Sequence, residues 1–407
     1  MAPDNQKIDA FKAISNAYHR IILTKSFSDL VIGSFFVVFI FRITQSVQLT
    51  IIGLVLYYLG GFCGVLLVSL LSLKVSFLNI LRLTFLSQGI LYFLLIIFWP
   101  VFHSWAFIFL FLLGMCLGAY FICQHLFNLS VVNSHENRHK VIYSTLGIVR
   151  ILGTILPLLS GFFIKEVGYP IVFGIAGIVF IVSSGIPFDL KLHHRDIFSI
   201  IDLTKAINLA HFKEYSAYIF ITSLFGELRN YSLFLIPFFF LNRNEFNVGI
   251  LLSVIAVTTG TVTYLSKNRK RKETERYSIF GGIFIAIINF AFGVIWNPIM
   301  LIARSLLLPI GDIFFFPQSE SDEYILMQQM LDHKKLTLGI EFQFVREFLI
   351  FIGRAIAGAL FLYLLFTYNN DYMELGQHLM IAFSLWPLIG FLLRKFFIDS
   401  LREEKRY

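Results

Sequence analysis

Residues 47–71 read VQLTIIGLVLYYLGGFCGVLLVSLL, a stretch of 25 residues without one charged side chain. A helix that crosses the hydrocarbon core of a bilayer needs about 20 apolar residues, so this stretch predicts a membrane-spanning helix. The whole chain has the same character, because 57% of its 407 residues are hydrophobic and only 14% are charged. Soluble domains carry about 25% charged residues, so this composition excludes an ordinary soluble domain.

Apolar runs of this kind recur along the chain, and counting them predicts twelve spans in two sets of six. The predicted spans are Ser26–Ile43, Val47–Leu71, Ser76–Phe98, Ser104–Leu129, Ile142–Ile164, Pro170–Pro187, Glu214–Leu241, Val248–Leu265, Ser278–Trp296, Ile299–Pro317, Leu338–Phe366 and Gly376–Phe397. We therefore predict an all-α polytopic membrane protein with two pseudo-symmetric six-helix bundles. The predicted divisions are an amphipathic segment at 1–25, bundles at 26–188 and 214–397, a central loop at 189–213, and a tail at 398–407.

Lysine and arginine are distributed unevenly among the segments between these spans. Alternate segments, beginning with the N-terminal one, hold 24 of the 33 basic residues, and the opposite segments hold only Arg42, Lys165 and Arg243. Since positively charged loops stay on the cytoplasmic side, both chain ends are predicted to be cytoplasmic. The same distribution explains the net charge of +8 without nucleic acid, because these residues adjoin the anionic headgroups of the membrane.

A short pattern in the first predicted span recurs in the seventh. The pattern Asp29-Leu30-x-x-x-Ser34-x-Phe36 matches Glu227-Leu228-x-x-x-Ser232-x-Phe234 at an offset of 198 residues. In the fifth and eleventh spans, Val149-Arg150 matches Val345-Arg346 at an offset of 196. Two matches at nearly equal offsets favour a duplicated unit of six helices.

This organisation resembles the major facilitator superfamily of secondary transporters over essentially the whole chain. The resemblance is carried by six plus six spans, a long middle segment and short loops on one side. The stretch from Gly64 to Lys74 stands where that superfamily has a Gly-x-x-x-Asp-x-x-Gly-Arg pattern, and it lacks the aspartate. Gly153, Pro157 and Gly161 in the fifth span are similar to a Gly–Pro motif of antiporters, with Leu156 in place of a glycine. The resemblance implies two bundles that rock around a central cavity.

Ionisable side chains inside the spans are the first candidates for function, because each is costly in a bilayer unless it is paired. The repeat makes Asp29 with Arg150, and Glu227 with Arg346, corresponding acid–base sets. The resemblance implies that the helices concerned are neighbours. These groups either exchange protons during transport or hold the bundle together as structural ion pairs, and the sequence leaves both interpretations open. His125 in the fourth span is likewise either a proton carrier or a packing residue.

The eleventh span has the highest density of such groups. Glu347 and Arg354 are seven residues apart and share a helix face, and Arg346 is offset from Arg354 by only about 80°. Guanidinium groups bind carboxylates and phosphates, so this face predicts either a cavity for an anionic solute or a buried ion-pair network. The candidate cavity residues are Arg150, Arg346, Arg354, Tyr120, Gln124 and Arg229, and the candidate proton-coupling or charge-pair residues are Asp29, Glu227, Glu347 and Glu341.

These residues predict a secondary active transporter that moves a small or amphipathic, anionic solute by proton-coupled alternating access. A lipid or glycolipid flippase on the same fold is the alternative, because a cavity rich in phenylalanine tolerates acyl chains. The chain has no sequence motif of an enzyme, and its three cysteines lack the spacing of a metal site. We therefore expect no enzymatic activity, no cofactor and no metal.

The expected partners are a small-molecule substrate, protons and membrane lipids, with no nucleic acid, and the expected state is a monomer. The first 25 residues are polar and amphipathic and lack the apolar core of a cleaved signal peptide. We expect a multi-pass protein of a bacterial plasma membrane. The direction of transport stays open, although the Gly–Pro resemblance points toward efflux or antiport.

Overall fold

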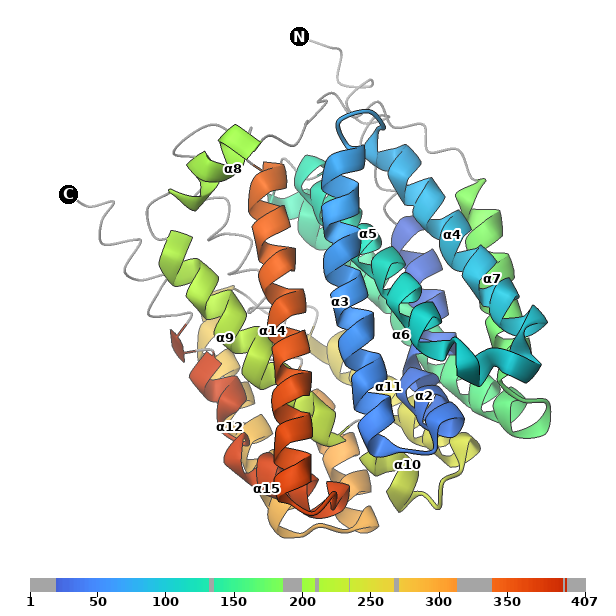
Figure 1. Ribbon diagram of the computed structural model, residues 1–407. Coiled ribbons are helices and arrows are strands. Elements are labelled where there is room, and N and C mark those ends of the chain that lie inside the picture. The colour runs from blue at the N-terminus through green and yellow to red at the C-terminus, as the bar shows by residue number, and fades with distance from the viewer. Residues whose placement is uncertain are drawn as a thin grey trace.

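The computed structural model describes residues 20–131, 135–185, 200–208, 212–233, 235–266, 271–312, 339–390 and 392–393, which are almost entirely helical (Figure 1). The first half of the chain forms a helix at Arg20–Val31, then η1 (Gly33–Phe35), α2 (Phe36–Thr44), α3 (Val47–Leu71), α4 (Phe77–Ile97), η2 (Trp99–Ser104), α5 (Ala106–Val131), α6 (His135–Glu166) and α7 (Tyr169–Ser184). The second half forms α8 (Ile200–Ile207), α9 (Phe212–Leu233), α10 (Ile236–Phe240), α11 (Glu245–Ser266), α12 (Arg271–Val294), a helix over 298–312, α14 (Gly339–Thr367) and α15 (Tyr372–Ala382).

Six helical segments of the described chain are long and apolar enough to cross a membrane. They are Val47–Leu71, Phe77–Ile97, Ala106–His125, Tyr215–Phe240, Glu245–Val262 and Glu341–Thr367. The helix at Arg20–Val31 and α2, bent by 41° at the break between them, form a seventh if they are counted as one span. Large apolar side chains are exposed on these helices, such as Leu70 at 63% and Phe366 at 64%, and lipid accommodates such surfaces. The chain is a multi-pass helical membrane protein.

The remaining predicted spans correspond to shorter, charged or only partly described helices, so the count of twelve stays a prediction. Two of them, Tyr169–Ser184 and Ile279–Val294, are apolar but shorter than 18 residues. The long α6 has several charged residues in its first turns. The predicted last span, Gly376–Phe397, is interrupted after α15 by a turn at 383–385. The predicted central loop at 189–213 contains a short helix, α8, and most of its other residues lie outside the described part.

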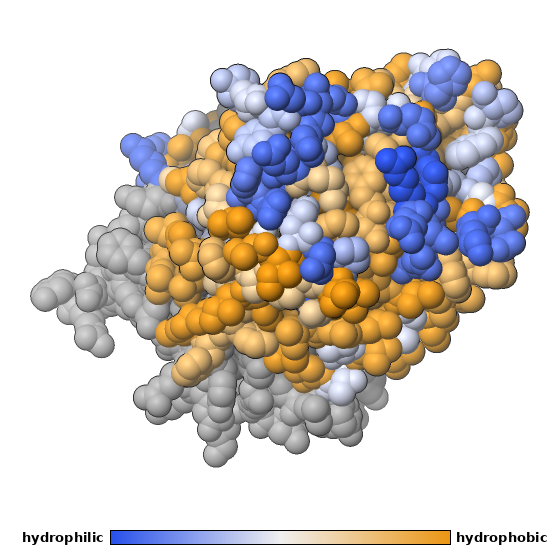
Figure 2. Space-filling model, turned by 90° about the horizontal axis from the view of Figure 1, so that it is seen from below, coloured by the Kyte–Doolittle hydropathy of each residue, from blue (hydrophilic) through white to orange (hydrophobic). Residues whose placement is uncertain are grey.

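One end of the helix bundle is closed by short turns whose residues adopt left-handed backbone conformations. We call it the lower end, since it lies at the bottom of Figure 1. The turn after α10 places Asn242 and Arg243 at φ of 60° and 54°, and the turn after α14 places Asn369 and Asn370 at φ of 51° and 64°. Asparagine tolerates this region better than most residues, so these turns reverse the chain within four residues. Seen from below, this end has separate hydrophilic patches between hydrophobic surfaces (Figure 2).

Helices α3 and α5 approach each other so closely that only glycine fits at their crossing. A Cβ added at Gly60 would lie 2.0 Å from the carbonyl oxygen of Phe111, and one at Gly114 would lie 1.9 Å from that of Tyr57. Gly64 and Gly118 make equally close approaches one turn further along. Small residues four apart permit backbone-to-backbone packing in membranes. These four glycines therefore form a tight contact between α3 and α5.

The two halves of the chain meet along two pairs of helices. In Figure 1, α3 and α14 run side by side through the middle of the molecule, and α6 packs against α11 behind them. At the second crossing, a Cβ on Gly249 would lie 2.6 Å from the carbonyl oxygen of Pro157, and one on Gly161 would lie 2.7 Å from that of Glu245. The Gly–Pro segment of the fifth predicted span is therefore part of the contact between the halves.

Candidate functional site

A buried carboxylate lies where α3 and α14 meet α9. Glu227 of α9 is 5% exposed. Its Oε1 accepts a hydrogen bond of 2.5 Å from the hydroxyl of Tyr58 on α3, and its Oε2 lies 3.6 Å from Nε of Arg354 on α14. Asn230, one turn along α9, donates from Nδ2 to the same Oε2 at 3.3 Å. We call these four residues the Glu227 cluster.

The Glu227 cluster joins the two halves of the chain. Tyr58 comes from the first half, whereas Glu227 and Arg354 come from the second. The guanidinium of Arg354 also lies 5.5 Å from the centre of the Tyr58 ring, so the tyrosine contacts both members of the ion pair. A charge buried in a membrane protein is stable only when it is paired and hydrogen-bonded. Loss of the Glu227 charge would therefore weaken contacts within the second half and across the interface together.

A second ionic group bridges the halves further along α14. Glu347, 3% exposed, contacts Arg346, and its Oε1 lies 3.4 Å from Nε2 of His125 on α5. Nε2 of His125 also lies 3.4 Å from a terminal nitrogen of Arg346, and the imidazole stacks on Phe121 at 6.3 Å. We call His125, Arg346 and Glu347 the Glu347 cluster. An imidazole beside a carboxylate is a pair that can exchange a proton near neutral pH.

A third ion pair closes the lower end between the halves. Nε and a terminal nitrogen of Arg42 on α2 donate to the two carboxylate oxygens of Glu245 on α11, at 2.7 and 3.1 Å. Arg42 also donates to the carbonyl oxygen of Arg243 at 2.8 Å, and the Tyr169 hydroxyl donates to Glu245 at 3.4 Å. Two parallel hydrogen bonds of this kind are among the stronger polar contacts in proteins. We call this contact the lower-end ion pair.

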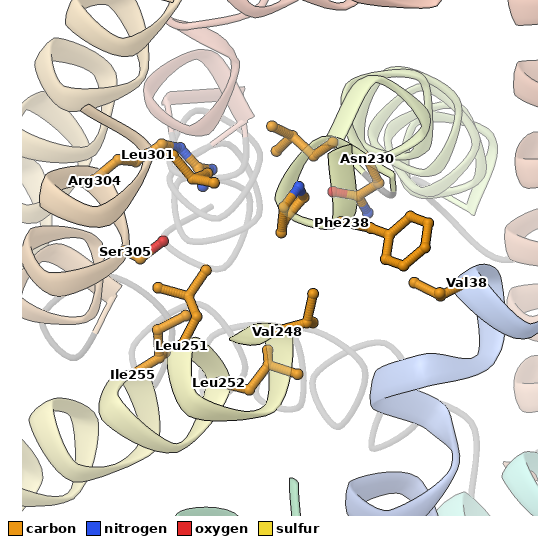
Figure 3. Close-up of a pocket in the computed structure, with 12 residues that line it drawn as sticks. Val38, Asn230, Phe238, Val248, Leu251, Leu252, Ile255, Leu301, Arg304 and Ser305 are labelled. Carbon is orange, nitrogen blue, oxygen red and sulfur yellow. The ribbon is translucent and has the colours of Figure 1, made fainter. Parts of the chain in front are cut away.

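A cavity of about 250 Å³ lies among α2, α9, α10, α11 and the 298–312 helix (Figure 3). Its walls are mostly apolar, with Phe238 and Leu251 among them, and its polar lining residues are Asn230, Arg304 and Ser305. Nε of Arg304 donates to Oδ1 of Asn289 at 2.9 Å. The cavity therefore has apolar walls and a guanidinium on one side.

The pairings predicted from the repeat differ from those in the structure. Glu227 lies against Arg354 rather than Arg346, and Arg346 lies against Glu347. Arg354, about two turns further along α14 than Arg346, is the arginine that lies near Glu227 of α9. Asp29, which is 55% exposed, contacts Lys25 one turn earlier. Its predicted partner Arg150 has a side chain outside the described part.

The other predicted site residues have varied surroundings. Tyr120 is 2% exposed and packs on Phe85 within the first half, with ring centres 6.0 Å apart, so its ring does not face an open cavity. Gln124 is half-buried on α5. Arg229 lies near Asp312 and Glu227, and its buried Nε has no hydrogen-bond partner among the described residues. Glu341, near the start of α14, is 1% exposed.

Tyr58, Arg42 and Glu245 were not among the predicted site residues. Tyr58 lies in an uncharged span and carries no signal apart from its hydroxyl. Arg42 and Glu245 lie at span edges, where charges are ordinary. Arg304 belongs to the ionisable residues inside spans that the sequence marks as first candidates, although no role was predicted for it there. Within the described part of the chain, no three His, Cys, Asp or Glu side chains gather as a metal site would require.

Comparison with known proteins gives similarity in structure but not in sequence. No protein-family model matches the chain, and no curated protein matches it. Solved structures do match it, and three of them align with nearly all of its length. In the structure of a D-xylose–proton symporter, the TM-score is 0.61 and the sequence identity 12%, and the alignment covers 93% of this chain and 97% of the symporter. For a proton-dependent oligopeptide transporter, the TM-score is 0.62 and the identity 10%, and the alignment covers 98% of this chain and 100% of the transporter.

The third, an auto-inhibited peptide transporter of the POT family, has a TM-score of 0.65 at 12% identity over 95% of this chain and 96% of its own. All three proteins are transporters, and at these identities the likeness concerns the fold alone. The chain has the same fold as these transporters, as the resemblance of its sequence to the major facilitator superfamily implies.

Proposed function

We propose that this chain is a secondary active transporter that moves a small or amphipathic anionic solute and couples that movement to protons. The observation that carries the proposal is the Glu227 cluster, a buried carboxylate held from both halves of the chain. The fold supports it, because the similar structures include a proton symporter and proton-dependent peptide transporters. A carboxylate at the interface between two rocking bundles can link its protonation to their separation.

The coupling step is a proton transfer to Glu227. While the carboxylate is ionised, it accepts from the Tyr58 hydroxyl and pairs with Arg354. A proton bound at Oε2 would remove the negative charge, weaken the contacts with Arg354 and Tyr58, and favour an anion nearby because the charge of Arg354 is no longer balanced. Release of the proton would restore these contacts and disfavour the anion. Proton binding can shift the balance between the two conformations only by as much as the proton affinity of Glu227 differs between them.

The lower-end ion pair supports alternating access from the other side of the molecule. In the state described here, Arg42 and Glu245 hold the halves together at that end. For a substrate to pass through the lower end, this contact must break. The Glu347 cluster lies on the same interface, and its His125–Glu347 pair offers a second place for a proton.

The deciding experiment is proton flux in proteoliposomes that contain a pH-sensitive dye. Vesicles with the wild-type protein are exposed to small carboxylates, sugars and dipeptides, with and without an imposed pH gradient. We expect at least one solute to move protons with it, and Glu227→Gln to abolish that coupled flux. Glu166→Gln is the matched control, because Glu166 is about half exposed at the end of α6 and contacts only Lys165.

Two results would contradict the proposal. One is coupled flux in Glu227→Gln at the wild-type rate. The other is the absence of any solute flux together with transfer of fluorescent lipids between leaflets, which would establish the flippase alternative. Measurement of both activities in the same vesicles separates the two outcomes.

The orientation in the membrane is also a proposal. The lower-end turns carry few basic residues, so the positive-inside rule places them on the outer face. Asn369 lies in an exposed turn at that end. Asn369→Cys in intact cells should react with a membrane-impermeant maleimide, whereas the native Cys116 and Cys123 are buried. Labelling of Asn369→Cys only after the cells are broken open would reverse the orientation.

A further inference from the structure

We propose that the cavity shown in Figure 3 is the binding site for a small monocarboxylate with an apolar body, and that Arg304 holds its carboxylate. This inference rests on the proposed function and adds the place and class of the substrate. It differs from the site expected from the sequence, which centred on Arg346 and Arg354. In the structure, both of those arginines contact carboxylates of the protein.

The guanidinium of Arg304 is held in position without an ion pair to its head group in the described structure. Its Nε donates to Oδ1 of Asn289, and the group lies 5.5 Å from the centre of the Phe292 ring. These two contacts fix its orientation and use one of its nitrogens. Figure 3 shows Arg304 reaching from its helix toward the space between the surrounding helices. The terminal nitrogens of a guanidinium form a fork that matches a carboxylate.

Positive charge gathers at one side of the cavity in the described part of the chain. Arg229 and Arg304 are close enough to interact electrostatically, and both interact with Asp312. Arg229 also interacts with Glu227, which already pairs with Arg354. Asp312 and Glu227 are therefore each shared between two arginines. A bound carboxylate would add a negative charge beside these guanidinium groups, which is a strong reason for binding in a medium of low dielectric constant.

The walls and the size of the cavity indicate what is attached to the carboxylate. The apolar walls include Leu251, Leu252 and Ile255 of α11, and Phe238 of α10 lies across the cavity from Arg304 (Figure 3). Apolar walls favour an apolar body by the hydrophobic effect. A volume of about 250 Å³ lies below the range of roughly 300–1,000 Å³ that is usual for drug-sized ligands. The site suits a short aliphatic or a single aromatic carboxylate.

Asn230 connects this cavity to the proton site. It lines the cavity, and its Nδ2 donates to Oε2 of Glu227. A ligand that fills this cavity would therefore contact a side chain that is hydrogen-bonded to the group whose protonation is proposed to drive transport. This connection explains how substrate and proton could influence each other without sharing one residue.

The test is binding of hexanoate to the purified protein, measured by isothermal titration calorimetry, with hexanamide as the uncharged probe. We expect hexanoate to bind and hexanamide to bind about tenfold more weakly or worse, because the charge-assisted contact is lost. Arg304→Gln should remove this preference for the anion, and Arg304→Lys should retain part of it. The control is Arg243→Gln, at an exposed arginine in the turn after α10, which should leave the preference intact.

Each outcome decides between sites. Anion preference that survives Arg304→Gln and disappears in Arg354→Gln would overturn the assignment and return the site to the Glu227 cluster. No preference for hexanoate in the wild-type protein would also overturn it. If Arg304→Gln fails to fold, Ser305→Phe narrows the same cavity without changing a charge and should weaken hexanoate binding. Binding that depends on Arg304 without proton-coupled flux would refute the proposed function and leave this inference standing.

Discussion

Helix α3 takes part in two interfaces of opposite character. On one face it meets α5 through Gly60 and Gly64, where the backbones touch and no side chain intervenes. Toward α14 and α9 it presents Tyr58, which reaches a buried ion pair. The first interface lies within the first half of the chain, and the second lies between the halves.

The difference indicates which interface is built to separate. When two helix backbones pack directly against each other, a small increase in the distance between the helices removes much of the dispersion attraction. An ion pair that includes a titratable group can be made and broken by a proton without rebuilding the helices around it. We therefore expect α3 and α5 to move as one unit, and α3 and α14 to come apart during transport. The predictions below test this contrast.

The largest effect is expected for Gly60→Ala. Its new Cβ would lie 2.0 Å from the carbonyl oxygen of Phe111, so the helices must separate, and overpacking of this kind costs about 3 kcal/mol or more. Most of the protein should fail to yield a monodisperse peak in detergent. Gly226→Ala is the matched control in α9, because its nearest outside atom lies at 4.0 Å. Equal yields from the two variants would remove the argument for a fixed α3–α5 contact.

The next effect is on coupling rather than folding. Tyr58→Phe deletes the hydroxyl that donates to Glu227 and keeps the ring beside Arg354. Loss of a hydrogen bond to a charged group costs about 1.5–3 kcal/mol. Because this contact joins the coupling carboxylate to the first half of the chain, its loss should slow proton-coupled flux by roughly tenfold to hundredfold. Coupled flux at the wild-type rate in Tyr58→Phe would contradict the role of Tyr58.

A smaller effect is expected for the lower-end ion pair. Arg42→Gln removes a two-point contact between the halves, and Arg42 is partly exposed, so we expect about 1 kcal/mol in favour of the state open at that end. Spin labels at Gln45 and Asn242 should show a larger population of long distances. The exchange Arg42→Glu with Glu245→Arg should restore part of the short-distance population. If Arg42→Gln leaves the distances unchanged, the pair does not hold the lower end closed.

The smallest effect is expected at a residue that the sequence suggested for the cavity. Tyr120 is buried and packs against Phe85 within the first half. Tyr120→Phe keeps the ring, and we expect flux within about a factor of three of wild type, because volume-conserving changes in a core cost little. A loss comparable to that of Glu227→Gln would place Tyr120 in the transport pathway after all.

Much of the fold could be predicted from hydropathy, because a bilayer forces long apolar segments into helices wherever they occur. The observed α3, α4 and α14 agree within two residues with predicted spans. The prediction of spans was less complete for helices that are short or that carry charged residues in their first turns. The bent first span and the broken last one have no sequence signal beyond ordinary glycines and turns.

The sequence by itself determined that this chain lies in a membrane, and that its few buried charges, Glu227 and Arg354 among them, are the residues to examine. The tertiary structure decided which of them meet. Whether Glu227 faces Arg346 or Arg354 depends on the rotation and crossing of α9 and α14, which neighbouring helices set together. Hydropathy is a property of each segment, whereas a pairing is a property of two segments and the distance between them. For that reason the role of Tyr58, an uncharged residue in an uncharged span, emerged only from the fold.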